Sequence, residues 1–326
     1  MPNTFLRPSV IARATVGLLY RELTVARTVW TDAINPGEFS GALNDTVTMK
    51  VPARRVARKR TLRAGTPIVN DTSTEFGVPV KLDTDVYNGA PITDEELTLD
   101  ITDFAAQILS PQVRAVVEGV DEEVVDMIEN AVYPAGMVVD PTDTDLVVSG
   151  ETDWYFAALR ARKILNKNHV PQTGRTLLIG SNVEELIRRS DRFNRFDNRG
   201  PAASDALSGA TIGDIAGFDV VLSDEIDDDA AYAYHRTAFV LATRSPLVPR
   251  GATFAQNRSA AVANGASEFY NGLSVRWLMD YDYTNTTDRS LVNTWVGTAQ
   301  VTDPVAPQNP ASALANMRAV AIREGS

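Results

Sequence analysis

The sequence predicts an α+β fold, in which one long helix lies on a sheet built from distant parts of the chain. Three observations support this prediction: an amphipathic pattern over 110–132, strand-like alternation over 45–53 and 75–87, and a strand pattern over 272–303. The apolar fraction of 44% and the charged fraction of 22% are ordinary for a globular protein. A chain of 326 residues has room for two domains, or for one domain with large excursions.

Residues 1–39 are expected to form an N-terminal arm. A short amphipathic helix fits Val10–Leu23, and the stretch TVARTVW at 24–30 resembles a strand. The arm is only weakly patterned and has little core of its own, so we expect it to pack on another part of the protein. Its basic side chains are candidate contact residues: Arg7, Arg13, Arg21 and Arg27.

Residues 40–86 are expected to form a long two-stranded hairpin. Its middle is strongly basic and contains no acidic residue between the first and last of these side chains: Arg54, Arg55, Arg58, Lys59, Arg60 and Arg63. A solvated loop and a nucleic-acid contact are two alternative interpretations. An isolated hairpin is marginal in water, and the following stretch from Asp71 to Asp103 is rich in acidic residues. We therefore expect the hairpin to lie on a neighbouring copy, with complementary charges setting its register.

The helix over 110–132 is the element around which the rest of the chain is organised. Ser110 is predicted to cap it and Pro111 fits its first position, where a missing N–H costs nothing. Apolar residues recur at three- and four-residue steps on one stripe: Val113, Val116, Val117, Val120, Val124, Met127, Ile128 and Ala131. Acidic residues fall mostly on the other side: Glu118, Asp121, Glu122, Glu123, Asp126 and Glu129.

Residues 133–245 are expected to form a compact mixed unit. A helix is predicted over 152–168, followed by a strand at 176–181 and a helix at 182–190 that Ser181 would cap. One strand is predicted around 218–223 and another within 231–246.

The pattern from Pro246 to residue 303 is all strand. The turn-like stretch at 284–290 would join two strands there, and this is the candidate sheet beneath the long helix. Residues 304–326 read as a Pro-rich linker followed by a weak helical pattern.

The composition provides few of the side chains that commonly act in catalysis or bind metals. The net charge of −11 argues against a dedicated nucleic-acid binder, and a chain without cysteine has no disulfide, thiolate nucleophile or Cys-ligated zinc. The two histidines, His169 and His235, are expected at a helix end and in strand packing. No phosphate-binding glycine loop is present, and residues 140–151 have Asp145 where a calcium loop needs glycine. We therefore predict no catalytic residue, cofactor or metal, and no membrane span.

Three stretches in order carry a resemblance to a known family. They are RTLLIGSNVEELIRRS (175–190), IAGFDVVLSDEI with AYAYHRTAFVLATRSP (215–226 and 231–246), and GLSVRWLMDYDYTNTTDRSLVNTWVGTAQV (272–301). Together they resemble the major capsid proteins of tailed bacteriophages, which have the Hong Kong 97-like fold. The similarity covers about residues 1–303, and it is strongest to the branch that uses a separate scaffolding protein.

The resemblance implies a domain plan. It comprises an N-terminal arm (1–39), an extended loop (40–86), a peripheral domain (87–132 and 246–303) with a spine helix at 110–132, an axial domain (133–245) and a C-terminal tail (304–326). The basic residues of the arm and of the extended loop would then be subunit contacts.

The same resemblance implies a coat protein that assembles as pentamers and hexamers into an icosahedral head around double-stranded DNA, without reading its sequence. The implied partners are further copies, a scaffolding protein, a portal and a decoration protein, and the implied location is the virion, assembled in the host bacterial cytoplasm. The alternative function is that of an encapsulin-type nanocompartment shell, which has the same architecture. A tail-tube or decoration protein fits the long helix and the chain length less well, and an enzyme would be limited to carboxylate or lysine chemistry.

Overall fold

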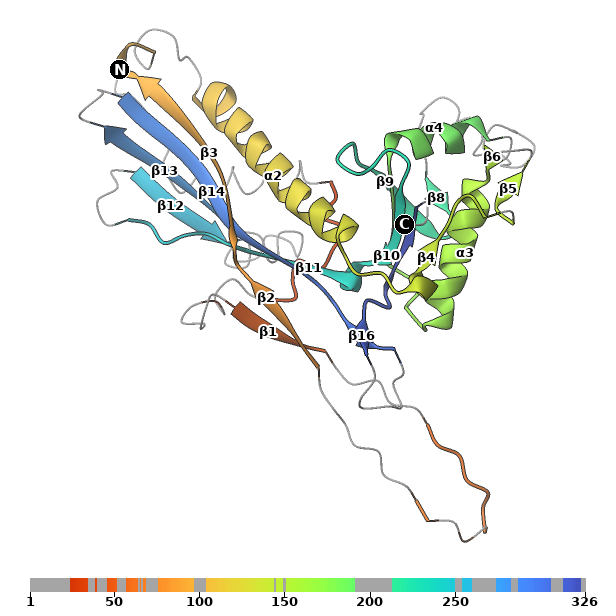
Figure 1. Cartoon of the computed structure of the whole chain (residues 1–326). Helices are drawn as coiled ribbons and strands as arrows, with labels where there is room; N and C mark the ends of the chain where they lie inside the picture. The colour runs from red at the N-terminus through yellow and green to blue at the C-terminus, as the bar shows by residue number, and fades with distance from the viewer. Residues whose placement is uncertain are drawn as a thin grey trace.

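The computed structural model describes residues 24–34, 39, 46–51, 57–63, 65, 67–68, 76–96, 104–143, 145–148, 151–190, 213–249, 254–259, 274–282, 287–305 and 313–323. Within these residues the protein is a mixture of helices and sheets. Figure 1 shows a long sheet with one long helix along it, a second unit with its own sheet and two helices, and a hairpin that projects away from both.

The larger part of the molecule is built on a five-stranded sheet with β14 as its central strand. β14 pairs with β3 along one edge, and with β13 and β11 along the other, while β12 pairs with β13. The sheet therefore combines a strand that precedes the long helix in the sequence with strands that follow it, as predicted. The strands are β3 (Thr84–Thr93), β11 (Phe239–Arg244), β12 (Phe254–Ser259), β13 (Ser274–Asp282) and β14 (Thr287–Gln300).

The long helix α2 (Ser110–Glu129) packs across β14 and β3 and confirms the predicted stripe. Its valines at 113, 116, 117, 120 and 124 are at most 4% exposed. The predicted cap at Ser110 is wrong, because a π-helical turn, η4 (Ala105–Leu109), runs directly into α2 and Leu109 already has helical dihedral angles. The buried Gln112 joins the helix to the sheet: its amide donates to Ser290 O at 2.9 Å, and its oxygen accepts from Ser290 Oγ at 2.7 Å.

The hairpin prediction is confirmed at its base, where β1 (Thr46–Val51) pairs antiparallel with β2 (Phe76–Lys81). One face of this ribbon is apolar and packs on the end of the five-stranded sheet, in a cluster that includes Val80, Val240 and Val301. Just after β2 the chain crosses β14 so closely that a Cβ on Gly297 would lie 2.2 Å from Lys81 O. Glycine at this position therefore lets the hairpin cross the sheet.

The second unit is a six-stranded sheet in the order β4-β17-β10-β7-β9-β8. Helices α3 (Trp154–Lys167) and α4 (Ser181–Arg189) belong to it, and the Asp153 carboxylate caps α3 by accepting from Tyr155 N and Phe156 N. The strands are β4 (Val138–Val139), β7 (Arg175–Ile179), β8 (Asp214–Ile215), β9 (Phe218–Leu222), β10 (Ala231–His235) and β17 (Ala319–Ile322). The short elements are η5 (Ala135–Met137) and the pairs β5 (Val147–Val148) with β6 (Glu151–Thr152) and β15 (Asp303–Pro304) with β16 (Leu314–Ala315).

The weak helical pattern expected in the tail is wrong. Ala319–Ile322 forms β17, which lies between β4 and β10 and is at most 1% exposed. A short, continuously apolar run fits a strand covered on both faces as well as a helix, so periodicity could not separate the two.

The single strand expected within 231–246 is two strands. β10 ends at His235, a 3₁₀ turn, η8 (Arg236–Ala238), follows, and β11 begins at Phe239 in the other sheet. The chain thus passes from the six-stranded to the five-stranded sheet within three residues.

Two further local predictions are wrong. Residues 24–30 form turns, and only Trp30 makes a β-bridge, to Val240. Ser181 is the first residue of α4 and not its cap, because Gly180 occupies that position, where a Cβ would lie 2.4 Å from Asp227 O.

Candidate functional site: the hairpin, the N-terminal segment and the sheet junction

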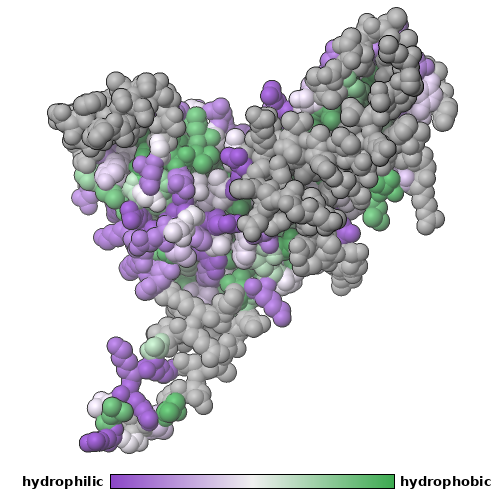
Figure 2. Space-filling view, turned by 180° about the vertical axis from the view of Figure 1, so that it is seen from behind, coloured by the Kyte–Doolittle hydropathy of each residue, from purple (hydrophilic) through white to green (hydrophobic). Residues whose placement is uncertain are grey.

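The projecting part of the hairpin carries the predicted basic residues that the structure describes. Arg58, Lys59, Arg60 and Arg63 are all exposed, and they lie where the ribbon extends farthest from both sheets (Figure 1). Figure 2 shows this tip as mostly hydrophilic with a few hydrophobic groups. The other two predicted residues, Arg54 and Arg55, lie outside the described part of the chain.

Two apolar side chains accompany these charges. Leu62 is 86% exposed and Ile68 is 71% exposed. Apolar side chains of this size usually gain from burial, and these two remain exposed on the projecting part of the hairpin.

The N-terminal segment 24–34 is fixed to the body of the protein. Val25, Ala26 and Val29 are buried in the core cluster that also contains the apolar face of α2. Arg27, the one predicted arm residue that is described, is exposed on this segment. Arg7, Arg13 and Arg21 fall outside the described residues, as does the short helix expected at Val10–Leu23.

The residue that holds this segment is Asp121, which sequence reasoning placed on the solvated acidic face. It is 3% exposed. One carboxylate oxygen accepts from Thr24 N and Thr24 Oγ1, both at 2.8 Å, and the other accepts from Ala26 N at 2.7 Å. A signal was available, because Val117 and Val125 lie four residues before and after Asp121 and both are buried.

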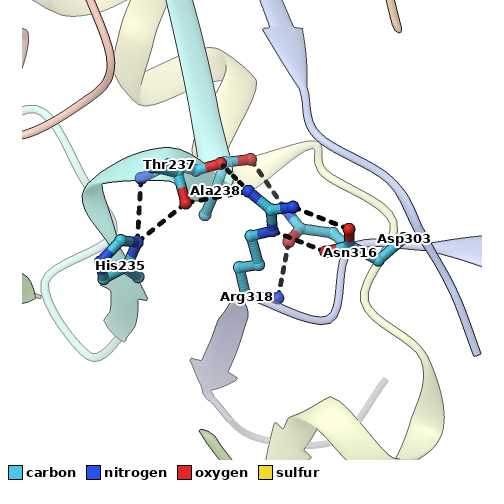
Figure 3. A network of polar contacts seen from close by, with 6 residues as sticks. All are labelled: His235, Thr237, Ala238, Asp303, Asn316 and Arg318. Carbon is cyan, nitrogen blue, oxygen red and sulfur yellow. Dashed lines mark hydrogen bonds and ion pairs between the residues drawn. The ribbon is translucent and has the colours of Figure 1, made fainter. Parts of the chain in front are cut away.

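Where the chain passes between the two sheets, a polar network joins the end of β10, the turn η8 and the C-terminal segment (Figure 3). At its centre the Arg318 guanidinium donates to both oxygens of Asp303, at 2.6 and 2.8 Å. It also donates to Thr237 Oγ1 at 3.0 Å, while Asn316 donates to Ala238 O at 3.3 Å. A bidentate Arg–carboxylate pair fixes geometry as well as charge, so this network holds the crossing strands in place.

The two histidines have structural positions. His235 is 7% exposed at the end of β10, and its Nδ1 accepts from Thr237 N at 3.3 Å. Burial, and then the positive charge of Arg318, lower the pKa of His235, so the ring is neutral at physiological pH. His169 follows the end of α3 with a φ of 58°. Both observations agree with the helix-end and packing roles predicted for these residues.

Within the described ranges, no group of three or more His, Cys, Asp or Glu side chains is arranged to hold a metal ion. The Asp140 carboxylate of the loop that partly resembles a calcium site accepts instead from Thr142 N and Thr142 Oγ1. Among the helices of the described chain, none combines the length and apolar character that a membrane crossing requires.

Comparison with known proteins gives one sequence family and a set of solved structures. The family described as phage capsid protein matches residues 77–288, more than half of the chain. No significant match was found among curated protein sequences.

Three solved structures illustrate the similarity in fold. That of Mycobacterium phage Che8 is 17% identical, with a TM-score of 0.58 over 92% of this chain and 90% of its own. The capsid of cyanophage P-SCSP1u is 12% identical, with a TM-score of 0.59 over 92% and 87%. The capsid of a native GTA particle is 9% identical, with a TM-score of 0.56 over 100% and 93%.

Proposed function

The chain belongs to the phage capsid protein family, and we propose that it is the major capsid protein of a tailed bacteriophage. In this proposal it assembles as pentamers and hexamers into an icosahedral head around double-stranded DNA. The observation that carries the proposal is the fold, which matches capsid structures over nine tenths or more of the chain. The protein has a structural role and no catalytic one.

We further propose that the parts follow the Hong Kong 97-like plan. Residues 1–39 are the N-terminal arm, 40–86 the extended loop, 87–132 and 246–303 the peripheral domain, and 133–245 the axial domain. The strand pairings support two adjustments: β11 pairs within the five-stranded sheet of the peripheral part, and β17 pairs within the six-stranded sheet of the axial part.

The projecting hairpin supports a role in self-assembly. A two-stranded ribbon is marginal in water, and this one carries exposed Leu62 and Ile68 beside its basic residues. Repeated heterologous contacts of one chain can build a closed shell. We propose that the basic residues of the hairpin and of the N-terminal arm lie at contacts between subunits.

The charge of the chain agrees with a container for DNA. A net charge of −11 does not favour tight binding to phosphates, and screening leaves weak repulsion beyond about 10 Å at 0.1 M salt. The proposal therefore includes no sequence-specific DNA contact. Its further partners are a scaffolding protein, a portal and a decoration protein, and its location is the virion, assembled in the cytoplasm of a bacterial host.

Electron microscopy of the purified protein tests the proposal, with expression alone and together with its neighbouring genes. We expect icosahedral shells, or sheets and tubes of pentamers and hexamers. Nucleic acid within the shells supports a phage head, whereas particles that enclose a protein cargo and no DNA identify an encapsulin-type shell. A uniform small oligomer under every condition would contradict both.

A further inference from the structure

The long helix begins before α2, and its first turn is irregular. Phe104 is already helical, the π-helical turn η4 (Ala105–Leu109) follows, and α2 continues from Ser110 without a break. A π turn holds about one residue more than an α turn, is rare, and occurs frequently at functional sites. Figure 1 shows the start of α2 at the end of the five-stranded sheet that is remote from the second unit.

Contacts on both sides of this turn reach the same place on the sheet. Before the turn, the rings of Phe104 and Trp277 meet edge to face, with their centroids 6.3 Å apart. After it, Ser290 Oγ donates to Gln112 Oε1 at 2.7 Å and accepts from Trp277 Nε1 at 3.1 Å. Phe104 and Gln112 are therefore both held by one pair of neighbouring sheet residues, Trp277 on β13 and Ser290 on β14.

The spacing of these two residues fits the sheet only if the helix contains the wider turn. Gln112 follows Phe104 by eight positions. At about 100° per residue, a regular α-helix would leave the two side chains about 80° apart around the axis, whereas one residue absorbed by a π turn reduces this to about 20°. The packing on Trp277 and Ser290 therefore requires the π form of the turn.

Pro111 favours the same form. Because helical residues precede Ser110, Pro111 lies within a continuous helix. In a regular α-helix a proline ring clashes with the backbone carbonyl four residues earlier, and here that carbonyl belongs to Gln107, inside η4. Two restraints, the Phe104 contact and the Pro111 ring, thus oppose the preference of the backbone for the α form.

We propose that η4 is a joint with two states. In the π state Phe104 packs on Trp277, as in this structure. In the α state Gln112 and the rest of α2 keep their places, while Phe104 turns away from Trp277 and the chain that enters the helix changes direction with it. The use of the joint rests on the proposed capsid function, because a chain that forms both pentamers and hexamers must meet its neighbours at different angles.

Hydrogen exchange of the amides of residues 105–110 in the unassembled, full-length subunit tests the two states. Pro111→Ala serves as the background, in which the ring no longer restrains the turn. Adding Phe104→Ala removes the second restraint, so we expect these amides to exchange about tenfold more slowly than in the background, since the turn is then free to adopt the favoured α form. If η4 has one state only, the lost packing should instead make exchange faster.

A matched control adds Phe156→Ala to the same background. Phe156 is also a partly buried aromatic residue, but it packs against the core cluster of the second unit. This control should leave the exchange of residues 105–110 unchanged. Unchanged or faster exchange in the Phe104 variant, or equally slow exchange in the Phe156 variant, would overturn the two states.

A single-residue deletion gives an independent test, which does not depend on the folding of the Phe104 variant. Deleting Ala106 together with Pro111→Ala leaves seven positions from Phe104 to Gln112, so a regular α-helix then directs both toward the same side, within about 20°. We expect this variant to fold with a urea midpoint close to that of the background. Deleting Ala115 from the regular part of α2 is the control and should lower the midpoint clearly. Equal effects of the two deletions would contradict an extra residue in η4.

Electron microscopy of the Ala106 deletion variant tests the use of the joint in assembly. Because this variant can no longer switch, we expect about tenfold fewer closed shells than from the wild type, with sheets or tubes built from one kind of ring in their place. Closed shells at the wild-type yield would overturn the role of the joint in assembly. Failure of the wild type itself to form any shell would instead contradict the proposed capsid function, and the exchange measurement would still decide whether η4 has two states.

Discussion

The carboxylate of Asp121 on α2 accepts a hydrogen bond of 2.7 Å from the backbone N–H of Ala26, a residue 95 positions earlier in the chain. Its other oxygen binds Thr24 through both the backbone N–H and the hydroxyl. One buried side chain therefore satisfies two backbone donors of a segment that has no regular secondary structure. This arrangement fixes the point at which the N-terminal segment is attached to α2.

We predict that Asp121→Ala lowers the free energy of unfolding by roughly 2 to 4 kcal/mol, because it leaves two backbone N–H groups near the core without an acceptor. Asp121→Asn should cost less, since its amide keeps one acceptor oxygen. Chemical unfolding measures both values, and limited proteolysis should show faster cleavage near Thr24. The adjacent Glu122→Gln is the control; equal effects at the two positions would contradict the assigned role.

Arg318→Lys should destabilise the junction between the two sheets by about 1 to 3 kcal/mol, because an ammonium group cannot form the bidentate pair with Asp303 and also reach Thr237. Arg160→Lys is a matched control, since Arg160 and Asp143 form an ion pair whose side chains are 42% and 47% exposed. That substitution should cost less than about 1 kcal/mol. Thermal unfolding distinguishes the two, and similar losses would argue against a special role for Arg318.

Gly297→Ala should displace the base of the hairpin, because the new methyl group would lie 2.2 Å from Lys81 O and 2.8 Å from Lys81 C. We expect a loss of about 1 to 3 kcal/mol in stability, as for overpacking elsewhere. Shell yield should fall as well, since the direction of the hairpin changes. Gly136→Ala is the control, with no atom within 4 Å of the added Cβ. Unchanged stability of Gly297→Ala would contradict the close crossing.

Glu225 should make stability depend on pH. Its pKa is raised in the folded protein to about 7 from an ordinary value of 4.5, so between these values the folded state keeps a proton that the unfolded chain has lost. Its contribution to stability therefore falls as pH rises from about 4.5 to about 7 and stays constant above that. Relative to the wild type, Glu225→Gln should gain stability across this interval. Urea unfolding at several pH values measures the difference, and parallel curves would disprove the shift.

Much of the fold could be predicted because its periodicity is strong. The valine stripe of α2 identified the helix and its buried face, and alternation identified the ribbon of β1 and β2. The sequence also indicated that the sheet beneath α2 comes from distant segments, since no single stretch near 110–132 could supply it. The order of these elements was sufficient to indicate the family.

The rest depended on contacts that local pattern does not record. In the sequence, Asp121 belongs to the charged face of the helix. Only the folded structure places Thr24 and Ala26 next to its carboxylate. β17 is too short and too uniformly apolar to be distinguished from a helix. The passage from β10 to β11 contains no glycine or proline, so nothing in the sequence marks the change of sheet.

The position of β17 in the sheet also affects how much of the chain must be synthesised before a subunit can assemble. The six-stranded sheet has β17 between β4 and β10, yet these four residues leave the ribosome long after both neighbours. A nascent chain can form its helix and hairpin but cannot complete this sheet until Ile322 has been made. Partly synthesised chains would therefore lack a complete six-stranded sheet and, under the proposed capsid function, would be poorly suited to entering a growing shell.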